Sequence, residues 1–473
     1  MFVGREDYLQ DLDGLWRKRI SSLVTCRGRR RIGKSTLIEE FARRSRARFV
    51  KLEGLHPEEG MDNRMQLDAF AKQLRIQADV EIPILEDWFE AFQVLGRVIG
   101  EAERTVLLLD EISWMGKYDP GFAGELKYAW DNVFSKKKNL VMVLCGSVSS
   151  WIDKKILRSK GFVGRPSLNL LVREIPLDKV RAFFGRSCSV GEIIDVLSVV
   201  GGVPKYLENI DPGLTAEENI RQLCFRPGGL LVDEFDEIFN DALDENLGLK
   251  KRMLQSLADG PLSASEIAGV VGCEYNGHIT ANLEELEIAG FISRECGRNP
   301  VSGLMVKEAR YRVSDNYTRF YLKCIEPSKM LIRDGLYNFI SLDTLPGWNA
   351  VMGLQFESLI LNNISPLLLA LQLQHAVLLS AAPYRQKSSK RGEGCQIDLL
   401  LQTKKGVFVV EIKRREHLGA EVITEVEEKV ARLKLKGGRS VRTVLVHSGT
   451  LARTVAAENY FDRIVDVEEL LIR

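Results

Sequence analysis

Short apolar runs alternate with amphipathic segments over the first 210 residues of the chain. The runs have the length of buried strands, and the segments between them repeat apolar residues with a helical period. This alternation predicts an α/β domain in which helices flank a parallel sheet. The predicted strands cover residues 22–26, 48–52, 105–109, 140–145 and 168–172.

The alternation stops after Asp211-Pro212-Gly213, and a helical pattern takes its place. One helix is predicted at 249–257, a second from a serine cap within residues 262–268 to Gly272, and a third at about 277–289. Two strand-like segments follow, at 291–294 and 309–313. Three helices and a two-stranded wing make the order of a winged helix-turn-helix.

The pattern returns to α/β in the last third of the chain. A 473-residue chain is too long for one hydrophobic core, so several domains are expected. We predict three, at residues 1–210, 211–344 and 345–473. The predicted elements of the third domain are a helix around 356–360, strands at 396–400 and 407–413, a helix at 421–435 and a strand at 441–446.

Composition indicates an ordinary globular protein, with 45% hydrophobic and 28% charged residues. The formal net charge is only +1, so binding to nucleic acid would depend on local patches. None of the eight cysteines forms a Cys-x-x-Cys pair, which fits a reducing cytoplasm. A charged N-terminus and an apolar window at 365–380 that is too short for a bilayer predict no signal peptide and no membrane partner.

One segment fills the G-x-x-x-x-G-K-[ST] phosphate-binding pattern without a mismatch. It reads Gly28-Arg29-Arg30-Arg31-Ile32-Gly33-Lys34-Ser35-Thr36 and lies between a predicted strand and a predicted helix. In that context, backbone amides and the helix N-terminus would cradle a polyphosphate. Lys34 would reach the β- and γ-phosphates, and the Ser35 hydroxyl would bind Mg²⁺. We expect ATP and Mg²⁺ as cofactors; the alternative is a chance glycine turn before a helix.

Two acids end the third predicted strand, as in a Walker B motif. Asp110 would hold Mg²⁺, and Glu111 would orient or polarise the attacking water. The next strand along the chain ends at Gly146-Ser147. Ser147 is therefore a candidate sensor of the γ-phosphate, although it would serve equally well as an N-cap for the segment after it.

These motifs, in this order, resemble the archaeal-type ATPase family of AAA+/STAND P-loop ATPases. The resemblance includes Phe2-Val3-Gly4-Arg5-Glu6, Cys145-Gly146-Ser147, Gly164-Arg165 and Gly201-Gly202-Val203-Pro204. It implies that Val3 and Gly4 line the adenine site and that the segment with Pro204 senses nucleotide state. It also implies that Arg165 responds to the γ-phosphate of ATP bound either in the same subunit (in cis) or in a neighbouring subunit. From the residues alone, a surface role for Arg165 is equally open.

The sequence of the predicted winged helix does not determine whether it binds DNA. Three glutamates on its third helix, Glu284, Glu285 and Glu287, would repel phosphates. The outward residues for reading a DNA major groove would be Asn276, His278, Thr280 and Asn282, with Arg294, Arg298, Lys307 and Arg310 near the wing. Packing or protein contact is the other reading of this module.

A second constellation lies in the last third of the chain. Glu411 and Lys413 share one face of a predicted strand, and Asp398 lies near the adjoining strand. Two carboxylates about 4 Å apart repel by roughly 1 to 4 kcal/mol. A divalent cation removes that repulsion and activates water for attack on phosphate. We expect Mg²⁺ or Mn²⁺ between Asp398 and Glu411, with Lys413 positioning that water or stabilising the developing charge.

An acid followed after a gap by Glu-x-Lys resembles the PD-(D/E)XK nuclease superfamily. The resemblance implies that Glu357, on a preceding helix, completes the metal site. The bland alternative is a sheet whose edge charges are only solvated. A local supply of positive charge for a phosphate backbone is expected from Lys387, Lys390, Arg391, Lys404, Lys405, Arg414 and Arg415.

Together these patterns favour an ATP-hydrolysing protein that couples nucleotide state to binding or cleavage of nucleic acid, with DNA preferred over RNA. One rival is a STAND-like switch that governs assembly with its own copies or with a partner protein, with a non-catalytic C-terminal domain. Another is a transcription regulator that acts through the winged helix.

Overall fold

The computed structural model describes residues 2–471 except 101–102, 148, 244, 307, 387, 389–392, 434 and 436–438. The chain divides into two compact units, which are described separately. The first joins Met1–Glu174 to Ile238–Asp244, and the second joins Ile175–Glu237 to Glu245–Arg473. The boundary predicted at residue 210 therefore falls inside the second unit.

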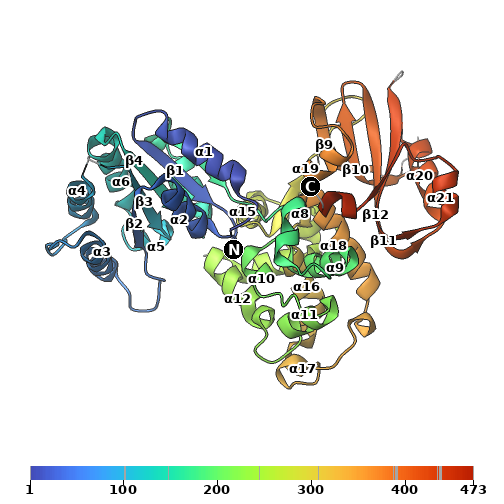
Figure 1. Ribbon diagram of the computed structural model, residues 1–473, viewed down its shortest axis with the longest axis horizontal. Helices are drawn as coiled ribbons and strands as arrows, with labels where there is room; N and C mark the ends of the chain where they lie inside the picture. The colour runs from blue at the N-terminus through green and yellow to red at the C-terminus, as the bar shows by residue number, and fades with distance from the viewer. Residues whose placement is uncertain are drawn as a thin grey trace. The chain divides into compact units, whose positions relative to one another are not determined.

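A five-stranded parallel sheet organises the first unit (Figure 1). Its order is β2-β3-β4-β1-β5, and every neighbouring pair is parallel. All five carboxyl ends therefore meet at one edge, where ligands collect in open α/β sheets. The strands are β1 (Ser22–Arg27), β2 (Arg48–Glu53), β3 (Thr105–Asp110), β4 (Leu140–Cys145) and β5 (Pro166–Leu171).

Every residue of β3 and β4 is buried, which explains their uninterrupted apolar sequences. Asp62 and Asp87 begin the helices α3 and α4 by accepting hydrogen bonds from backbone N–H groups of the first turn. The helices of this unit are α1 (Glu6–Trp16), α2 (Lys34–Ser45), α3 (Asn63–Ala78), α4 (Trp88–Ile99), α5 (Ile112–Met115), α6 (Phe122–Asn132) and α7 (Ser149–Ile152).

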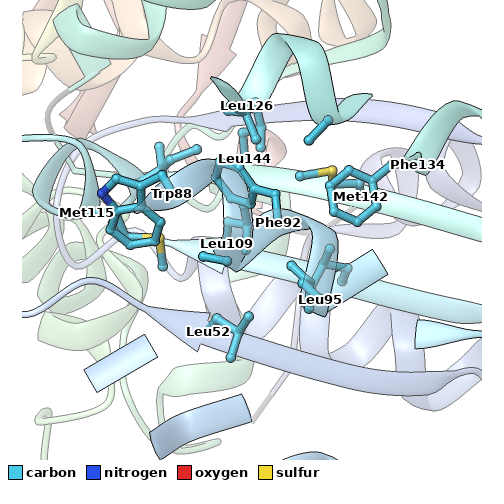
Figure 2. Packing of buried hydrophobic residues seen from close by; sticks show 14 of the residues in the cluster. Leu52, Trp88, Phe92, Leu95, Leu109, Met115, Leu126, Phe134, Met142 and Leu144 are labelled. Atoms are coloured by element: carbon cyan, nitrogen blue, oxygen red, sulfur yellow. The ribbon is translucent and has the colours of Figure 1, made fainter. Parts of the chain in front are cut away.

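Figure 2 shows part of the core that the sheet forms with helices α3 to α7. Trp88 and Phe92 of α4 pack beside the strand residues Leu109 and Leu144, and all four are buried. Trp88 meets Phe122 edge-on at 4.9 Å between ring centroids. This packing fixes β3 and β4, whose ends carry the candidate nucleotide residues.

The second unit begins with short helices, two of which start at capping sequences. Ser189 with Glu192, and Thr215 with Glu218, form reciprocal capping boxes. The helices are α8 (Leu177–Val180), α9 (Val190–Val200), α10 (Pro204–Leu207), α11 (Ala216–Cys224) and α12 (Leu230–Ala242). The last turn of α12 is grouped with the first unit.

The segment that follows has three helices and a small antiparallel sheet of order β6-β8-β7. The helices and the last two strands follow the predicted order; the two-residue strand β6 was not predicted. The elements are α13 (Leu247–Leu257), β6 (Leu262–Ser263), α14 (Ala264–Val270), α15 (Gly277–Ile288), β7 (Ile292–Glu295) and β8 (Arg310–Val313).

A second five-stranded sheet, β13-β12-β11-β10-β9, follows near the C-terminus (orange to red in Figure 1). Strands β9, β10 and β11 are antiparallel neighbours, whereas β11, β12 and β13 run parallel. Its strands are β9 (Leu378–Gln386), β10 (Cys395–Thr403), β11 (Gly406–Leu418), β12 (Ser440–Leu451) and β13 (Arg463–Asp466).

The remaining helices precede, connect or follow the strands of this sheet in the chain. Helix α20 ends at Arg432, slightly before the predicted end at residue 435. No helix among the described residues has the length and apolar character needed to cross a bilayer. The helices are α16 (Asn316–Phe320), α17 (Lys329–Arg333), α18 (Trp348–Asn362), α19 (Ile364–Ala370), α20 (Glu421–Arg432), α21 (Arg453–Ala457) and α22 (Glu468–Leu471).

Candidate functional site

The loop between β1 and α2 has the backbone of an anion cradle. Gly28 lies at φ 148°, and a Cβ there would come within 2.4 Å of the Val172 carbonyl oxygen. Gly33 lies at φ 82° and precedes α2, whose first turn receives no side-chain cap. The N–H groups of that turn therefore point toward the loop, where an anion is stabilised by the helix N-terminus.

Lys34 and Ser35 begin α2 and face the loop and the sheet edge. The Lys34 Nζ donates to the carbonyl oxygens of Gly28 and Arg29, at 3.1 and 3.2 Å, and so folds back over the loop. The Ser35 hydroxyl donates to Asp110 Oδ2 at 2.6 Å. The structure thus brings the P-loop serine and the Walker B aspartate into contact, although 75 residues separate them. Thr36, next on the helix, is exposed.

Glu111 is held in place by Ser147. In the sheet, β4 lies between β1 and β3, so the end of β4 is beside both motifs. Glu111 Oε2 accepts hydrogen bonds from the Ser147 backbone N–H and hydroxyl, each at 2.8 Å. Burial raises the pKa of Glu111, while Lys34 and the bonds from Ser147 oppose that rise. The structure places this acid at φ 47°, where it begins α5.

Lys51 is a member of this site that the sequence reasoning missed. Its Nζ lies 3.2 Å from Asp110 Oδ2 and 3.2 Å from Glu53 Oε2. Burial lowers the pKa of Lys51, but Asp110 and Glu53 outweigh that effect and the pKa is raised. A lysine in the middle of the apolar strand β2 was the available sequence clue.

The N-terminal segment contacts the P-loop through Arg5, which was also missed as a site residue. Val3 and Gly4 are partly exposed, whereas Arg5 is buried. The Arg5 Nη2 donates to the Ile32 carbonyl at 2.9 Å, and Nη1 donates to the Arg173 carbonyl. Burial lowers the pKa of Arg5. This anchoring keeps Val3 and Gly4 beside the phosphate loop.

The three P-loop arginines have different environments. Arg29 is buried, and Arg31 adopts a left-handed backbone at φ 68°. Arg30 forms an ion pair with Asp241, from the end of α12 that belongs to the first unit. The His56 Nε2 lies 3.8 Å from the same carboxylate. A phosphate contact by Arg30 would therefore compete with Asp241.

Arg165 lies at the opposite edge of the sheet from the P-loop. Its neighbour Pro166 pairs with Leu23, near the start of β1, and the strand runs five residues further to Gly28. At about 3.3 Å per residue, this separates the two by about 16 Å along the strand. The Arg165 guanidinium forms a two-pronged pair with Asp131, at 2.7 and 2.9 Å. Arg165 is therefore distant from its own P-loop in this structure, and its expected response to the γ-phosphate, in cis or from a neighbouring subunit, stays a prediction.

Pro204 belongs to the second unit, where it is the first residue of α10. Two positions later, the buried Tyr206 hydroxyl donates to Glu234 Oε1 at 3.1 Å. This bond joins α10 to α12. The expected role of Pro204 in sensing nucleotide stays a prediction.

The hairpin of β10 and β11 creates the second site. Its register pairs Leu399 with Val410, so the preceding Asp398 faces Glu411 across the hairpin. Asp398 Oδ2 accepts a hydrogen bond from the Ile412 N–H at 2.9 Å. Glu411 is fully buried. Burial, followed by the charges of Glu411 and Glu357, raises the pKa of Asp398 to about 7.

Two lysines neutralise this acidic pair. The Lys413 Nζ lies 3.0 Å from Glu411 Oε1 and 2.6 Å from Glu425 Oε2. The Lys429 Nζ lies 2.7 and 2.5 Å from the two Glu411 oxygens and 4.0 Å from Asp398 Oδ1. Sequence reasoning predicted Lys413 but missed Glu425 and Lys429. Both lie on one face of α20, one turn apart.

Glu357 is the residue expected to complete a metal site with Asp398 and Glu411. It lies on α18, where burial raises its pKa and Arg312 and Arg319 oppose that rise. Among the residues that the structure describes, no group of three or more His, Cys, Asp or Glu side chains is arranged to hold a metal ion. The charge of Glu357 nevertheless contributes to the raised pKa of Asp398, and a metal site shared by Glu357, Asp398 and Glu411 stays a prediction. The oxygen donors of Asp398 and Glu411 still suit a hard cation such as Mg²⁺ or Mn²⁺.

The described basic residues that were expected around this site either form ion pairs with other acids or lie far from Asp398 and Glu411. Arg414 pairs with Asp195 at 2.6 Å, and Arg415 pairs with Glu421 at 3.3 Å. The turn that holds Lys404 and Lys405 lies about six residues along the hairpin, or about 20 Å, from Glu411. Those two lysines are therefore remote from the acids, contrary to the prediction. Lys387, Lys390 and Arg391 lie outside the described residues.

Helix α15 is the third helix of the predicted winged helix, whose outward residues were expected to contact a DNA major groove. It offers few polar side chains for such contacts. Asn276 caps it by accepting from the His278 and Ile279 N–H groups. Asn282 is buried and donates to the His278 carbonyl, so its predicted outward position is wrong. His278 and Thr280 are exposed.

Two of the arginines near the predicted wing already donate hydrogen bonds within the protein. Arg310 donates to the Pro261 carbonyl and to Glu266, and Arg298 donates to the carbonyls of Leu379 and Gly303. Lys307 lies outside the described residues, and Arg294 is exposed. The wing therefore offers less free positive charge than its sequence suggested.

Comparison with known proteins adds likeness but no family assignment. No protein-family model matches the chain. An uncharacterized protein of Methanocaldococcus jannaschii is 23% identical over 359 residues, covering 76% of each chain. A Walker-type ATPase of Pyrococcus abyssi is 17% identical, with a TM-score of 0.47, covering 67% of this chain and 95% of that one. The ORC2 protein of Aeropyrum pernix is 13% identical, with a TM-score of 0.39, covering 70% and 94%.

A RuvB mutant of Thermotoga maritima is 14% identical, with a TM-score of 0.33, covering 62% of this chain and 91% of that one. We therefore assign the class of the first unit from its own sheet topology and phosphate loop. It is a P-loop core with a five-stranded parallel sheet, followed in the chain by a separate α/β region.

Proposed function

We propose that this protein binds ATP with Mg²⁺, hydrolyses it, and couples its nucleotide state to the binding or cleavage of nucleic acid. The observation that carries the nucleotide half is the 2.6 Å contact between the Ser35 hydroxyl and Asp110. A hydroxyl and a carboxylate converge there at the N-terminus of α2, beside the Lys34 ammonium. This is the donor set that a magnesium–triphosphate complex requires.

The residues have separable roles in that reaction. The glycine loop and the first turn of α2 bind the phosphates through backbone N–H groups, and Lys34 supplies a positive charge. Ser35 and Asp110 would hold Mg²⁺, which neutralises developing charge on the phosphate oxygens when it is bound. Glu111, which accepts two hydrogen bonds from Ser147, would position the attacking water. Arg165, which lies at the opposite edge of the sheet from its own loop, would serve the site of a neighbouring copy.

Equilibrium binding of a fluorescent ATP analogue tests the nucleotide half. Lys34→Ala should weaken binding at least tenfold, whereas Arg43→Ala, on the exposed face of the same helix, should not change it. Arg43 pairs only with the surface residue Glu40 in the described contacts, so it is a matched removal of one positive charge. Equal affinity in wild type and Lys34→Ala would mean that ATP binds elsewhere or not at all.

For the C-terminal region we favour a metal-dependent nuclease. Support comes from the register of β10 and β11, which sets Asp398 opposite Glu411 with Lys413 3.0 Å away. Asp398 and Glu411 would hold the cation, which would supply an activated water. Lys413 would stabilise negative charge on the phosphate being cleaved.

Cleavage of single- and double-stranded DNA and RNA should be measured with Mg²⁺ and with Mn²⁺, with and without ATP. Asp398→Asn and Lys413→Met should each abolish it, whereas Lys405→Met, at the far end of the hairpin, should not. Absence of any Asp398-dependent cleavage under all these conditions would remove the nuclease activity and leave the nucleotide site untouched.

A STAND-like switch is the second candidate, and a specific observation favours it. Glu411 already has two ammonium partners, and Arg414 and Arg415 are paired with acids. In that case the acids and lysines only stabilise the fold. The switch predicts nucleotide-dependent assembly, measured by light scattering with ATP and ADP, that is indifferent to Asp398→Asn.

The segment from α13 to β8 fits a winged helix, and DNA is the favoured target over RNA. His278, Thr280 and Arg294 are the exposed polar residues that would contact it. Affinity for duplex DNA should fall steeply with salt and should weaken in Arg294→Ala. Salt-independent or absent binding would favour a packing or protein-contact role for this segment.

A further inference from the structure

The acidic pair Asp398 and Glu411 has a counter-ion of its own. Lys429 approaches both oxygens of Glu411, at 2.7 and 2.5 Å, and lies 4.0 Å from Asp398 Oδ1. Its ammonium thus lies against the same carboxylate oxygens that a bridging divalent cation would contact. Such a cation and Lys429 cannot both hold these positions, because they would repel each other at contact distance.

The surroundings explain why a counter-ion is needed. Glu411 is fully buried, and a buried carboxylate is strongly destabilising unless it is paired. Lys413 divides its ammonium between Glu411 and Glu425, and Arg415 lies 3.6 Å from Glu425. Lys429 is therefore the ammonium most directly committed to the pair.

The Lys429 ammonium is also able to move away from Glu411 and Asp398. Lys429 projects from α20, a different element from the hairpin that carries the acids, and its side chain is 20% exposed. A lysine has a flexible four-carbon stem, so its charged head reaches water without movement of the helix. Removal of the ammonium leaves the carboxylates on the rigid hairpin in place.

We infer that Lys429 is a displaceable internal cation that sets the metal affinity of this site. Divalent metal enters by exchange with the Lys429 ammonium, which then faces solvent at the rim of the site. This role rests on the proposed metal-dependent function and adds to it the residue that controls when metal binds.

Calorimetric titration of nucleotide-free, full-length protein with Mn²⁺ tests the exchange. Lys429→Met should tighten Mn²⁺ binding by on the order of tenfold, because the metal no longer competes with an ammonium. Lys429→Arg keeps the positive charge and should bind Mn²⁺ no more tightly than wild type. Asp398→Asn defines the heat that comes from other sites.

Arg432→Met is the matched control. It removes one positive charge from the same helix, where Arg432 pairs with Glu428 and Glu393 and not with the acidic pair. Thermal melts in EDTA should show Lys429→Met less stable than Arg432→Met, with a larger rise in melting temperature on adding Mn²⁺. This second readout requires only that the variant folds in the presence of metal.

The outcomes separate the two levels of the proposal. If Mn²⁺ binding depends on Asp398 but Lys429→Met binds no more tightly than wild type, the exchange is wrong and the metal site stands. If a folded Lys429→Met cannot be obtained with or without metal, Lys429 is a fixed structural partner and the exchange is also wrong. If no Mn²⁺ binding depends on Asp398, both the exchange and the metal site are overturned.

Discussion

Ser147 donates two hydrogen bonds to the same oxygen of Glu111, one from its backbone N–H and one from its hydroxyl. This relationship joins the end of β4 to the acid that follows β3. It makes the serine a positioning residue for the acid that would orient the attacking water.

Replacement of Ser147 by alanine removes the hydroxyl bond and keeps the backbone bond. A hydrogen bond to a charged group contributes about 1.5–3 kcal/mol, so kcat for ATP hydrolysis should fall on the order of tenfold or more. ATP affinity should stay within about twofold, since Ser147 acts through Glu111. Steady-state hydrolysis and equilibrium binding measure the two quantities.

Ser113→Ala is the control for that change. It removes a buried hydroxyl from the neighbouring helix α5, and that hydroxyl has no hydrogen-bond partner among the residues that the structure describes. Its kcat should match wild type. An equal loss in both variants would show that the effect is one of packing and not of Glu111 orientation.

The position of Arg165 at the far edge of the sheet predicts catalysis between copies. Arg165→Ala has an intact P-loop, and Lys34→Ala has an intact arginine, so each should be inactive alone. Mixed in equal amounts, they should recover a fraction of wild-type ATPase activity, because one copy supplies the arginine and the other the site. Full activity of Arg165→Ala alone would restrict Arg165 to its pair with Asp131.

That pair also predicts an acid-sensitive contribution to stability. The Arg165 guanidinium, with help from Lys127, lowers the pKa of Asp131 to about 2, against about 3.9 for an unfolded aspartate. A lowered carboxyl pKa stabilises the fold above the unfolded value, and the contribution is lost as the pH falls from about 4 towards 2. Urea denaturation across this window should show a shallower pH dependence for Asp131→Asn than for wild type.

The Gly28 backbone predicts that even a methyl group disrupts the phosphate loop. A Cβ at this position would lie 2.4 Å from the Val172 carbonyl oxygen, at φ 148°. Gly28→Ala should therefore lower the melting temperature and abolish ATP binding. Gly124→Ala is the control, since a Cβ there meets no atom within 4 Å and the position is helical. It should be neutral or stabilising by up to about 1 kcal/mol.

Local patterns predicted much of the secondary structure. The five strands of the first sheet appear within about two residues of their predicted bounds, because buried parallel strands are continuous apolar runs. Strand β6 escaped prediction because two residues carry no periodicity, and its pairing depends on Tyr311 and Arg310 far along the chain. The link between residues 175–210 and the second unit likewise depends on long-range packing.

The sequence by itself determined the chemistry available: a glycine loop with Lys34 and Ser35, the acids Asp110 and Glu111 at the end of β3, and an acid with Glu-x-Lys near the C-terminus. Except for Asp398, which lies on the neighbouring strand β10, the residues of each motif are a few positions apart on one loop or strand, so local geometry fixes their relation. Only the tertiary structure decided their partners. It placed Ser147 on Glu111, set Arg165 at the opposite edge of the sheet from its own loop, brought Glu357 within range of the charges of Arg312 and Arg319, and brought Lys429 from a separate helix onto Glu411. Such contacts join residues far apart in the chain, where strand order and helix packing, and not local spacing, set the distance.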